Sequence, residues 1–302
     1  MPSTLLSADG SNPSPSAAGG SGAEKTSSFD ASRVLWRSLE FSASKLFITL
    51  DAEVHLEPGG PWKDAEPWLV PPKTRRAVAD DAADQRVRLE TSVLGRRSVE
   101  SVRFRSRDGQ AVQRFKHRLG GRGYTKTQRF LEGGVFLDRL SAASDAEADP
   151  SQWTRRSQRE FTLPEGAGCV QVVDPIQIFF LISASSIEKV GDAFSICAFS
   201  KDSFARLRLE AVEQLSRRAE YLENGAPCPG KERPMLWLRL DVEPLGAGAE
   251  HRFELMGLER DLKVRFDLQR RLPVEIQGRH AKMGSVSIRL KAAAWAENRS
   301  GD

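Results

Sequence analysis

The chain has 302 residues, with 45 Lys and Arg against 41 Asp and Glu, and a formal net charge of +4. A charge this small over this length is no argument for a nucleic-acid partner. The 39% apolar share is enough to form a core. The most apolar run, residues 178–182, is far too short for a membrane-spanning helix.

Residues 1–30 are mostly Ser, Gly, Ala and Pro and have almost nothing to bury. Such a composition cannot offset the entropy lost on ordering, so we predict a disordered tail, and a second one over residues 296–302. Residues 31–295 are expected to form a single β-rich domain. The start of the chain lacks the charged and apolar regions of an export signal, so the sequence as written predicts a cytoplasmic location.

The first clear strand is predicted over residues 46–56. Apolar residues occupy every second position there: Leu46, Ile48, Leu50, Ala52, Val54 and Leu56. Period-two alternation is typical of a strand with one buried face. The following stretch, rich in Pro, Gly and Trp, predicts a long loop near 57–85, because ordinary hairpin connections take two to five residues.

Further short strands are predicted between residues 87 and 163, with Asp108-Gly109 as a hairpin turn. An acidic loop near 141–152 interrupts them. The glycines at 120, 121 and 123 resemble a phosphate-binding loop only superficially. They lack the Lys-Ser/Thr pair and the following helix, so we interpret them as a hairpin turn.

One helix is predicted to begin at Asp174-Pro175, because Asp is a good N-cap and Pro suits the first helical position. Apolar residues recur there at helical spacing as far as Ile187, and Gly191 is expected to end the helix. Residues 203–215 alternate like a strand, but 210–222 also fit a helix, and both interpretations stay open.

Residues 236–290 alternate strongly in short segments separated by turns. The apolar positions are Leu236, Leu238, Leu240, Val242, Val264, Phe266, Leu268, Val274, Ile276, Val286, Ile288 and Leu290. Turns are expected at 246–248, 270–271 and 283–284. The predicted fold class is therefore mainly β: a curled antiparallel sheet or partly open β-barrel with one central amphipathic helix.

The segments 266–276 and 282–290 resemble the C-terminal signature of a bacterial domain-of-unknown-function family, number 3108. In that family a strand ends in Leu-Pro-Val, as at Leu272-Pro273-Val274, and a Gly-led strand such as the one from Gly284 follows. The resemblance implies a curled antiparallel sheet around a helix, loosely like the lipoprotein carriers of the bacterial envelope. It also implies a periplasmic or envelope location if the start site is misassigned, and it assigns no catalytic residue.

The sequence shows no catalytic or metal-binding constellation. Three cysteines (Cys169, Cys197 and Cys228) include no CxxC pair, which leaves room for one disulfide with one free thiol. Cys197 is interpreted as a small core residue and Cys228, between two prolines, as exposed. The four histidines, His55, His117, His251 and His280, lack metal-ligand spacing. We expect no metal and no cofactor, and an enzymatic site around Asp174, His251 and His280 is the least favoured hypothesis.

Between residues 96 and 139, twelve Lys and Arg residues stand against only four acidic ones. Six of them are predicted to form a basic face that binds a ligand: Arg103, Arg105, Arg107, Arg114, Lys116 and Arg118. Rows of guanidinium groups bind phosphates and carboxylates well. A solvated outer face is the alternative. Aromatic residues are too sparse among them to favour single-stranded nucleic acid.

These observations favour a non-enzymatic binding or envelope-maintenance module that holds an amphipathic or lipid-like ligand, with its acidic head on part of the basic face. The alternative is a scaffold with a fully packed interior that docks an acidic protein through that face. An interior without a cavity would argue against the first hypothesis. The sequence does not predict the oligomeric state.

Overall fold

In a computed structural model, residues 29–45, 48–59, 69–79, 83–119, 123–144, 149–228, 232–246 and 253–295 are described. The predicted tails therefore lie outside the described residues, apart from Phe29 and Asp30. These two belong to the ordered domain: Phe29 is buried, and the Asp30 carboxylate accepts a hydrogen bond from Ser32 N at 3.0 Å. The described residues form seventeen strands, which confirms the predicted mainly β class.

The strands of the N-terminal half follow one another in space as they do in the chain. They are β1 (Trp36–Lys45), β2 (Ile48–Pro58), β3 (Gln85–Val93), β4 (Arg96–Phe104), β5 (Ala111–Leu119), β6 (Tyr124–Leu131), β7 (Gly134–Ser141) and β8 (Arg155–Thr162). All pair antiparallel with their neighbours. Short 3-10 turns, η1 (Ala31–Arg33) and η2 (Pro150–Gln152), precede β1 and β8.

The second half of the chain supplies the other strands. They are β9 (Val172–Val173), β10 (Ala193–Ser200), β11 (Ser203–Arg218), β12 (Leu222–Glu223), β13 (Ala226–Pro227), β14 (Glu232–Pro244), β15 (Arg260–Asp267), β16 (Leu272–His280) and β17 (Gly284–Trp295). The segment left open between strand and helix is thus strand β11. It forms a long antiparallel pair with β14, and this pairing fixes the extended conformation where local pattern did not.

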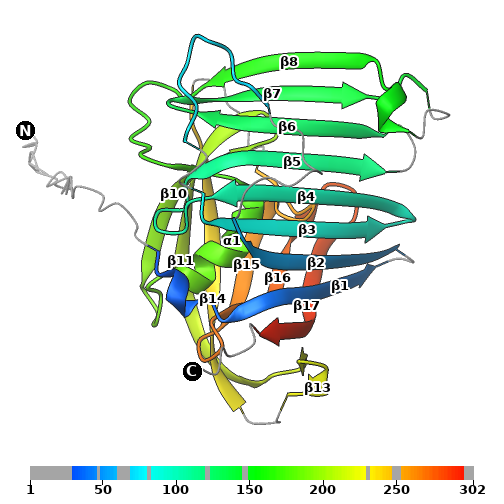
Figure 1. Cartoon of the computed structure of the whole chain (residues 1–302). Coiled ribbons are helices and arrows are strands. Elements are labelled where there is room, and N and C mark those ends of the chain that lie inside the picture. The colour runs from blue at the N-terminus through cyan, green and yellow to red at the C-terminus, as the bar shows by residue number, and fades with distance from the viewer. Residues whose placement is uncertain are drawn as a thin grey trace, which may run out of the picture.

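The two halves join through β1, which pairs with β2 on one side and with β17 on the other. The continuous order is β9-β10-β11-β14-β15-β16-β17 followed by β1 to β8. Among the described strands, only β9–β10 and β12–β17 are parallel. Among the described residues no pairing joins β8 to β9, so the sheet curls without closing. Figure 1 shows β1–β8 as a front layer and β10, β11 and β14–β17 behind it, with α1 between them.

The predicted helix is confirmed but is shorter than expected. Asp174 caps the turn η3 (Pro175–Gln177) through a capping box with Gln177, and α1 (Ile178–Ala184) follows. All seven residues of α1 are buried, so it has no solvent face. The chain becomes extended at Ser185 rather than at Gly191, because Arg271 Nε donates to Ser183 O (3.1 Å) and its Nη1 to Ile187 O (2.8 Å).

The helix packs against the front layer through aromatic side chains and also contacts β16 of the other layer. Phe41 of β1 and Phe104 of β4 meet Phe179 and Phe180, with ring centroids 5.6 and 4.9 Å apart. Trp36 Nε1 donates to Ser183 Oγ at 2.9 Å. No helix in the described residues has the length and apolar character needed to span a bilayer.

A disulfide joins Cys169 to Cys197, with Cα atoms 5.8 Å apart. Cys197 is buried, as predicted, but as half of a bridge rather than as a free core thiol. The 28-residue separation encloses β9, η3 and α1, so the bridge closes the loop that carries the central helix. Cys228 is the free cysteine; it is half-buried, and its thiol lies 3.4 Å from Glu223 Oε1.

Candidate functional site

A cavity of about 440 Å³ lies between the two layers of the curled sheet. This volume falls in the range of small-molecule sites. Its walls come from β1–β6, from η3, from the turn between β10 and β11, from residues 254–258 and from β16–β17. Segments far apart in the sequence therefore build one interior space.

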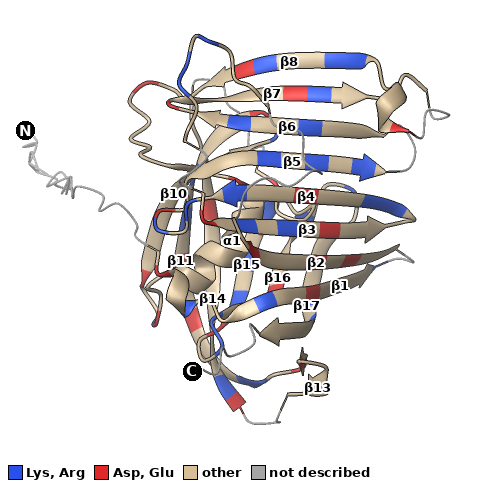
Figure 2. Ribbon diagram, in the orientation of Figure 1, with Lys and Arg blue, Asp and Glu red and all other residues tan. Residues whose placement is uncertain are grey.

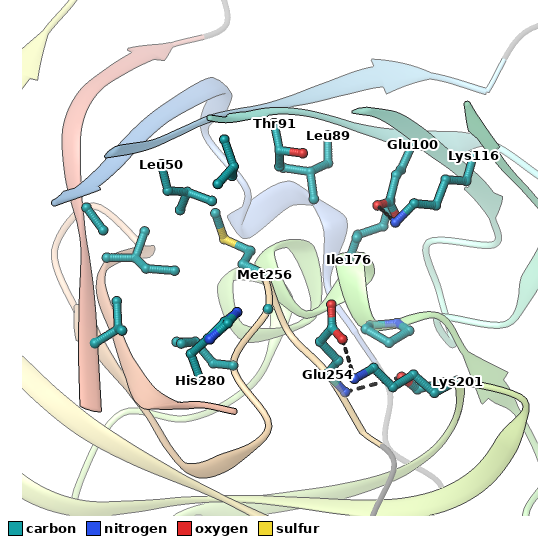
Figure 3. Close-up of a pocket in the computed structure, with 18 of the residues that line it drawn as sticks. Leu50, Leu89, Thr91, Glu100, Lys116, Ile176, Lys201, Glu254, Met256 and His280 are labelled. Atoms are coloured by element: carbon teal, nitrogen blue, oxygen red, sulfur yellow. Dashed lines mark hydrogen bonds and ion pairs between the residues drawn. The ribbon is translucent and has the colours of Figure 1, made fainter. Parts of the chain in front are cut away.

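One wall of the cavity is apolar. Leu50 and Leu89 line it from the front layer, and Val286 and Ile288 line it from β17. Figure 3 shows the Met256 side chain reaching into the space between these walls. Alternation in β2, β3 and β17 puts these side chains on the inner face of the sheet, where they present a surface suited to a hydrocarbon chain.

The opposite wall is charged and is centred on Glu100, which is 7% exposed. Its carboxylate contacts Arg114, and its Oε1 lies 2.6 Å from Lys116 Nζ. Burial alone would raise the pKa of Glu100, but the two cations outweigh it and hold the pKa at about 2. Glu100 is therefore ionised at neutral pH.

Arg114 also serves a second buried carboxylate. Its Nε lies 3.3 Å from Asp174 Oδ2, and Asp174 is fully buried. Burial raises the pKa of Asp174, and the Glu100 charge adds to that effect, although Arg114 opposes both. Arg114 thus ties the charged wall to the residue that begins the central helix.

Two more lysines extend the charged wall. Lys126 Nζ lies 2.9 Å from Asp202 Oδ1, and burial lowers the pKa of this lysine even though Asp202 opposes the shift. Lys201 Nζ lies 2.5 Å from carboxylate oxygens of both Glu254 and Glu259. Burial opposes the charge on Lys201, but these two acceptors raise its pKa overall. Figure 3 shows Lys201 and Glu254 together at the edge of the cavity.

Tyr124 lines the cavity beside two arginines. The guanidinium carbon of Arg139 lies 4.5 Å from the ring centroid, and that of Arg118 lies 5.8 Å from it. Neither arginine has a carboxylate partner within ion-pair distance among the residues that the structure describes. Cation–π contact leaves their hydrogen-bond donors open to a further anion.

Strand register explains why these cations gather. Glu100, Lys116, Lys126 and Arg139 are direct cross-strand neighbours on β4, β5, β6 and β7. Like charges directly opposite each other destabilise a sheet. Glu100 and Asp202 balance Lys116 and Lys126 in this row, whereas Arg139 has no carboxylate at ion-pair distance among the described residues and is suited to meeting an anion. Figure 2 shows Lys and Arg distributed over β5 and β6 in this region.

The structure brings only part of the predicted basic face together. Arg114 and Lys116 line the cavity, and Arg118 lies beside Tyr124 on the same face. Arg103 is on the opposite face, opposite Gln113. It is buried there, with Nη2 donating to Gly59 O at 2.6 Å. It therefore helps to hold the long loop after β2.

Arg105 and Arg107 also depart from the predicted row, because β4 ends at Phe104. The backbone N–H of Arg105 donates to Gln110 O, and the Arg105 carbonyl accepts a hydrogen bond from Gly109 N. Both arginines therefore lie in the turn before β5. Arg105 Nη2 lies 2.8 Å from Asp108 Oδ2, and Arg107 is exposed. The turn begins earlier than alternation suggested.

Sequence reasoning did not single out Tyr124, Lys126, Lys201 or Glu100 as site residues. Lys126 and Tyr124 lie in the basic stretch and alternate with Thr125, so a strand assignment for β6 carried a usable signal. Lys201 comes from the β10–β11 turn and Met256 from a connecting segment, and only tertiary packing brings these two to the cavity.

His280 lines the cavity, whereas His55 and His117 make contacts elsewhere. His55 pairs with Glu53 at 2.9 Å, and His117 packs on Trp153 with centroids 5.8 Å apart. His280 Nδ1 accepts from the backbone N–H of Lys282 at 3.1 Å, and His251 lies outside the described residues. No group of three metal-ligating side chains is found in the part of the chain that the structure describes.

No protein-family model and no curated protein matches the chain, so the resemblance to family 3108 is not supported by a family match. Among solved structures, the chain is similar to a beta-barrel-like protein of a domain of unknown function, DUF1849, from Brucella abortus. The identity is 7% and the TM-score 0.44, over 87% of this chain and 99% of that one. At that TM-score the likeness carries no argument about function.

Proposed function

We propose that the protein binds an amphipathic molecule with an anionic head and an acyl-like apolar part, without transforming it. The observation that carries this proposal is the divided wall of the 440 Å³ cavity, apolar around Leu50 and Ile288 and cationic around Lys116 and Lys126. The apolar part would lie beside Met256. The head would meet the lysine pair, with Arg118 and Arg139 beside Tyr124 as further donors.

The alternative, a scaffold with a fully packed interior, is less well supported because the cavity exceeds the volume of a few water molecules many times over. A membership in family 3108 would agree with the proposal but is not needed for it. The disulfide supports a location outside the reducing cytosol, because structural disulfides persist mainly in oxidising compartments. Alkylation of thiols in intact cells, followed by mass analysis of Cys169 and Cys197, tests that location.

The binding proposal is tested by fluorescence titration with dansyl-labelled undecanoic acid and with its methyl ester. We expect saturable binding of one acid per chain and weaker binding of the ester, because the ester removes the charge that the lysines meet. Lys116→Met with Lys126→Met should weaken acid binding roughly tenfold, the worth of about one charge-assisted contact, and leave ester binding unchanged.

Two further variants make the test specific. Met256→Trp fills the centre of the cavity and should weaken both probes. Arg208→Met, on the solvent side of β11 beside Glu210, removes an equivalent charge elsewhere and should change neither affinity. Equal affinity for acid and ester, or no saturable binding of either, would contradict the proposal.

A further inference from the structure

The hairpin ends of β1–β6 lie along one edge of the sheet. Leu50 is opposite Val93, and Arg97 is opposite Leu119, so the β1–β2, β3–β4 and β5–β6 ends are aligned. In Figure 1 this is the edge toward which the β1, β3 and β5 arrows point. The cavity lining includes Val93, Lys45 at the end of β1 and Met283 before β17, so the cavity extends to these ends.

Two of these hairpin ends present leucine side chains to solvent. Leu94 is 68% exposed and Leu119 is 37% exposed. Leu94 and Gly95 form a two-residue turn with φ of 51° and 72°. Such turns strongly favour Asn-Gly, and a left-handed conformation is unfavourable for leucine. The fold alone therefore does not explain an apolar residue at position 94.

Arg96 and Arg118 lie within two residues of the exposed leucines in the chain, and Lys282 lies in the turn between β16 and β17. Arg96 and Lys282 are exposed, and Arg118 is half-buried. Within the described residues none of the three has a carboxylate at ion-pair distance, whereas Arg97 contacts Glu90. Apolar side chains between cations match the interface of an anionic bilayer, where leucines enter the acyl boundary and cations stay among the headgroups. An acidic protein that bound this edge through charge alone would not require exposed leucines there.

We propose that this hairpin edge docks onto an anionic lipid surface and brings the adjoining end of the cavity close to it. The idea that docking lets an amphiphile pass between the lipid surface and the cavity rests on the proposed function. The docking itself is measured independently of that function. In the docked state Leu94 and Leu119 enter the interface, with Arg96, Arg118 and Lys282 near the lipid phosphates.

Co-flotation of the full chain with vesicles tests the docking. Vesicles of phosphatidylcholine with one-third phosphatidylglycerol are compared with pure phosphatidylcholine vesicles. We expect binding to the anionic vesicles that is several-fold tighter than to the neutral ones and that weakens with added salt. Leu94→Asn with Leu119→Asn should weaken the partition roughly tenfold, since two leucines no longer leave water.

Leu35→Asn is the matched control, because Leu35 is 49% exposed and precedes β1 at the end opposite the β1–β2 hairpin. It should leave vesicle binding unchanged. Leu94→Asn alone should raise the thermal midpoint, because Asn suits the turn better, so weaker docking by this variant cannot come from misfolding.

The docking proposal would be overturned if the wild type floated equally with both vesicle types, or if it floated with neither. Flotation with neither type would favour an acidic protein as the partner of this edge. Unchanged flotation of the double leucine variant would overturn it too. Titration with the dansyl acid separates the two proposals. The double leucine variant should still bind the probe. If the wild type bound vesicles but not the probe, the docking proposal would stand and the proposed function of the cavity would be refuted.

Discussion

Replacing Glu100 with Gln tests whether the charged wall of the cavity is held together as described. Gln keeps the size and most of the hydrogen-bonding capacity of the side chain but removes the charge between Arg114 and Lys116. The pKa of Glu100 falls from 4.5 to about 2 in the folded protein. At about 1.4 kcal/mol for each pH unit, this difference corresponds to about 3.5 kcal/mol at neutral pH. Asp174 still neutralises part of Arg114, so we expect a loss of about 2 kcal/mol in the free energy of unfolding.

The pH dependence has a defined direction. A carboxyl group whose pKa is depressed by folding stabilises the protein above its unfolded pKa, and that contribution is lost as the pH falls through the folded pKa. The difference between wild type and Glu100→Gln should therefore be constant above about pH 5.5 and shrink between pH 4.5 and pH 2. Urea unfolding at a series of pH values measures it.

Glu210→Gln is the matched control, because Glu210 also contacts two arginines, Arg208 and Arg239, but on the solvent side of β11. Its removal should cost less than about 0.5 kcal/mol, as for most exposed ion pairs. Glu100→Gln should also tighten binding of dansyl-undecanoic acid several-fold, because Lys116 loses its competing carboxylate. A cost for Glu100→Gln no larger than that for Glu210→Gln, or one independent of pH, would refute the reasoning.

Three further predictions concern the central helix and its surroundings. Cys169→Ala with Cys197→Ala should lower the free energy of unfolding by about 3.5 kcal/mol from the entropy of the opened 28-residue loop, and reductant should reproduce this in the wild type but not in the variant. Arg271→Met should cost about 2–3 kcal/mol in urea unfolding, because it leaves the Ser183 and Ile187 carbonyls without their donors; a cost under 0.5 kcal/mol would show that water replaces it. Asp174→Asn keeps an N-cap and removes a buried carboxylate whose pKa is raised by burial, so it should lower the free energy of unfolding by less than about 1 kcal/mol at pH 7. A larger loss of stability would mean that the contact with Arg114 dominates.

Much of the architecture was determined by the sequence itself. Alternation is a local property, and Leu236, Leu238 and Leu240 are buried on one face of β14 as predicted. The N-cap at Asp174 was equally local, because its carboxylate and Gln177 act within one turn. These features depend on the two periods of backbone geometry and on capping chemistry, which neighbouring residues specify.

Other features were decided only by the tertiary structure. The helix ends at Ala184, where Arg271, 86 residues from Ser185 in the chain, donates to the carbonyls of Ser183 and Ser185. The disulfide needed the parallel pairing of β9 with β10 to bring Cys169 near Cys197. Neither contact can be predicted from the residues next to it in the sequence.

The candidate site shows the same division. A basic stretch was visible from residue 96 to 139, but which of its cations share a face depends on where each strand ends and on its register. The turn after Phe104 removed Arg105 and Arg107 from the row, and pairing with β5 brought Lys126 into it. The cavity itself depends on the curl of the sheet and on Lys201 and Met256 from distant connections. Sequence alternation specified which side chains face inward. Only the long-range pairing of strands decided which of those side chains line the same cavity.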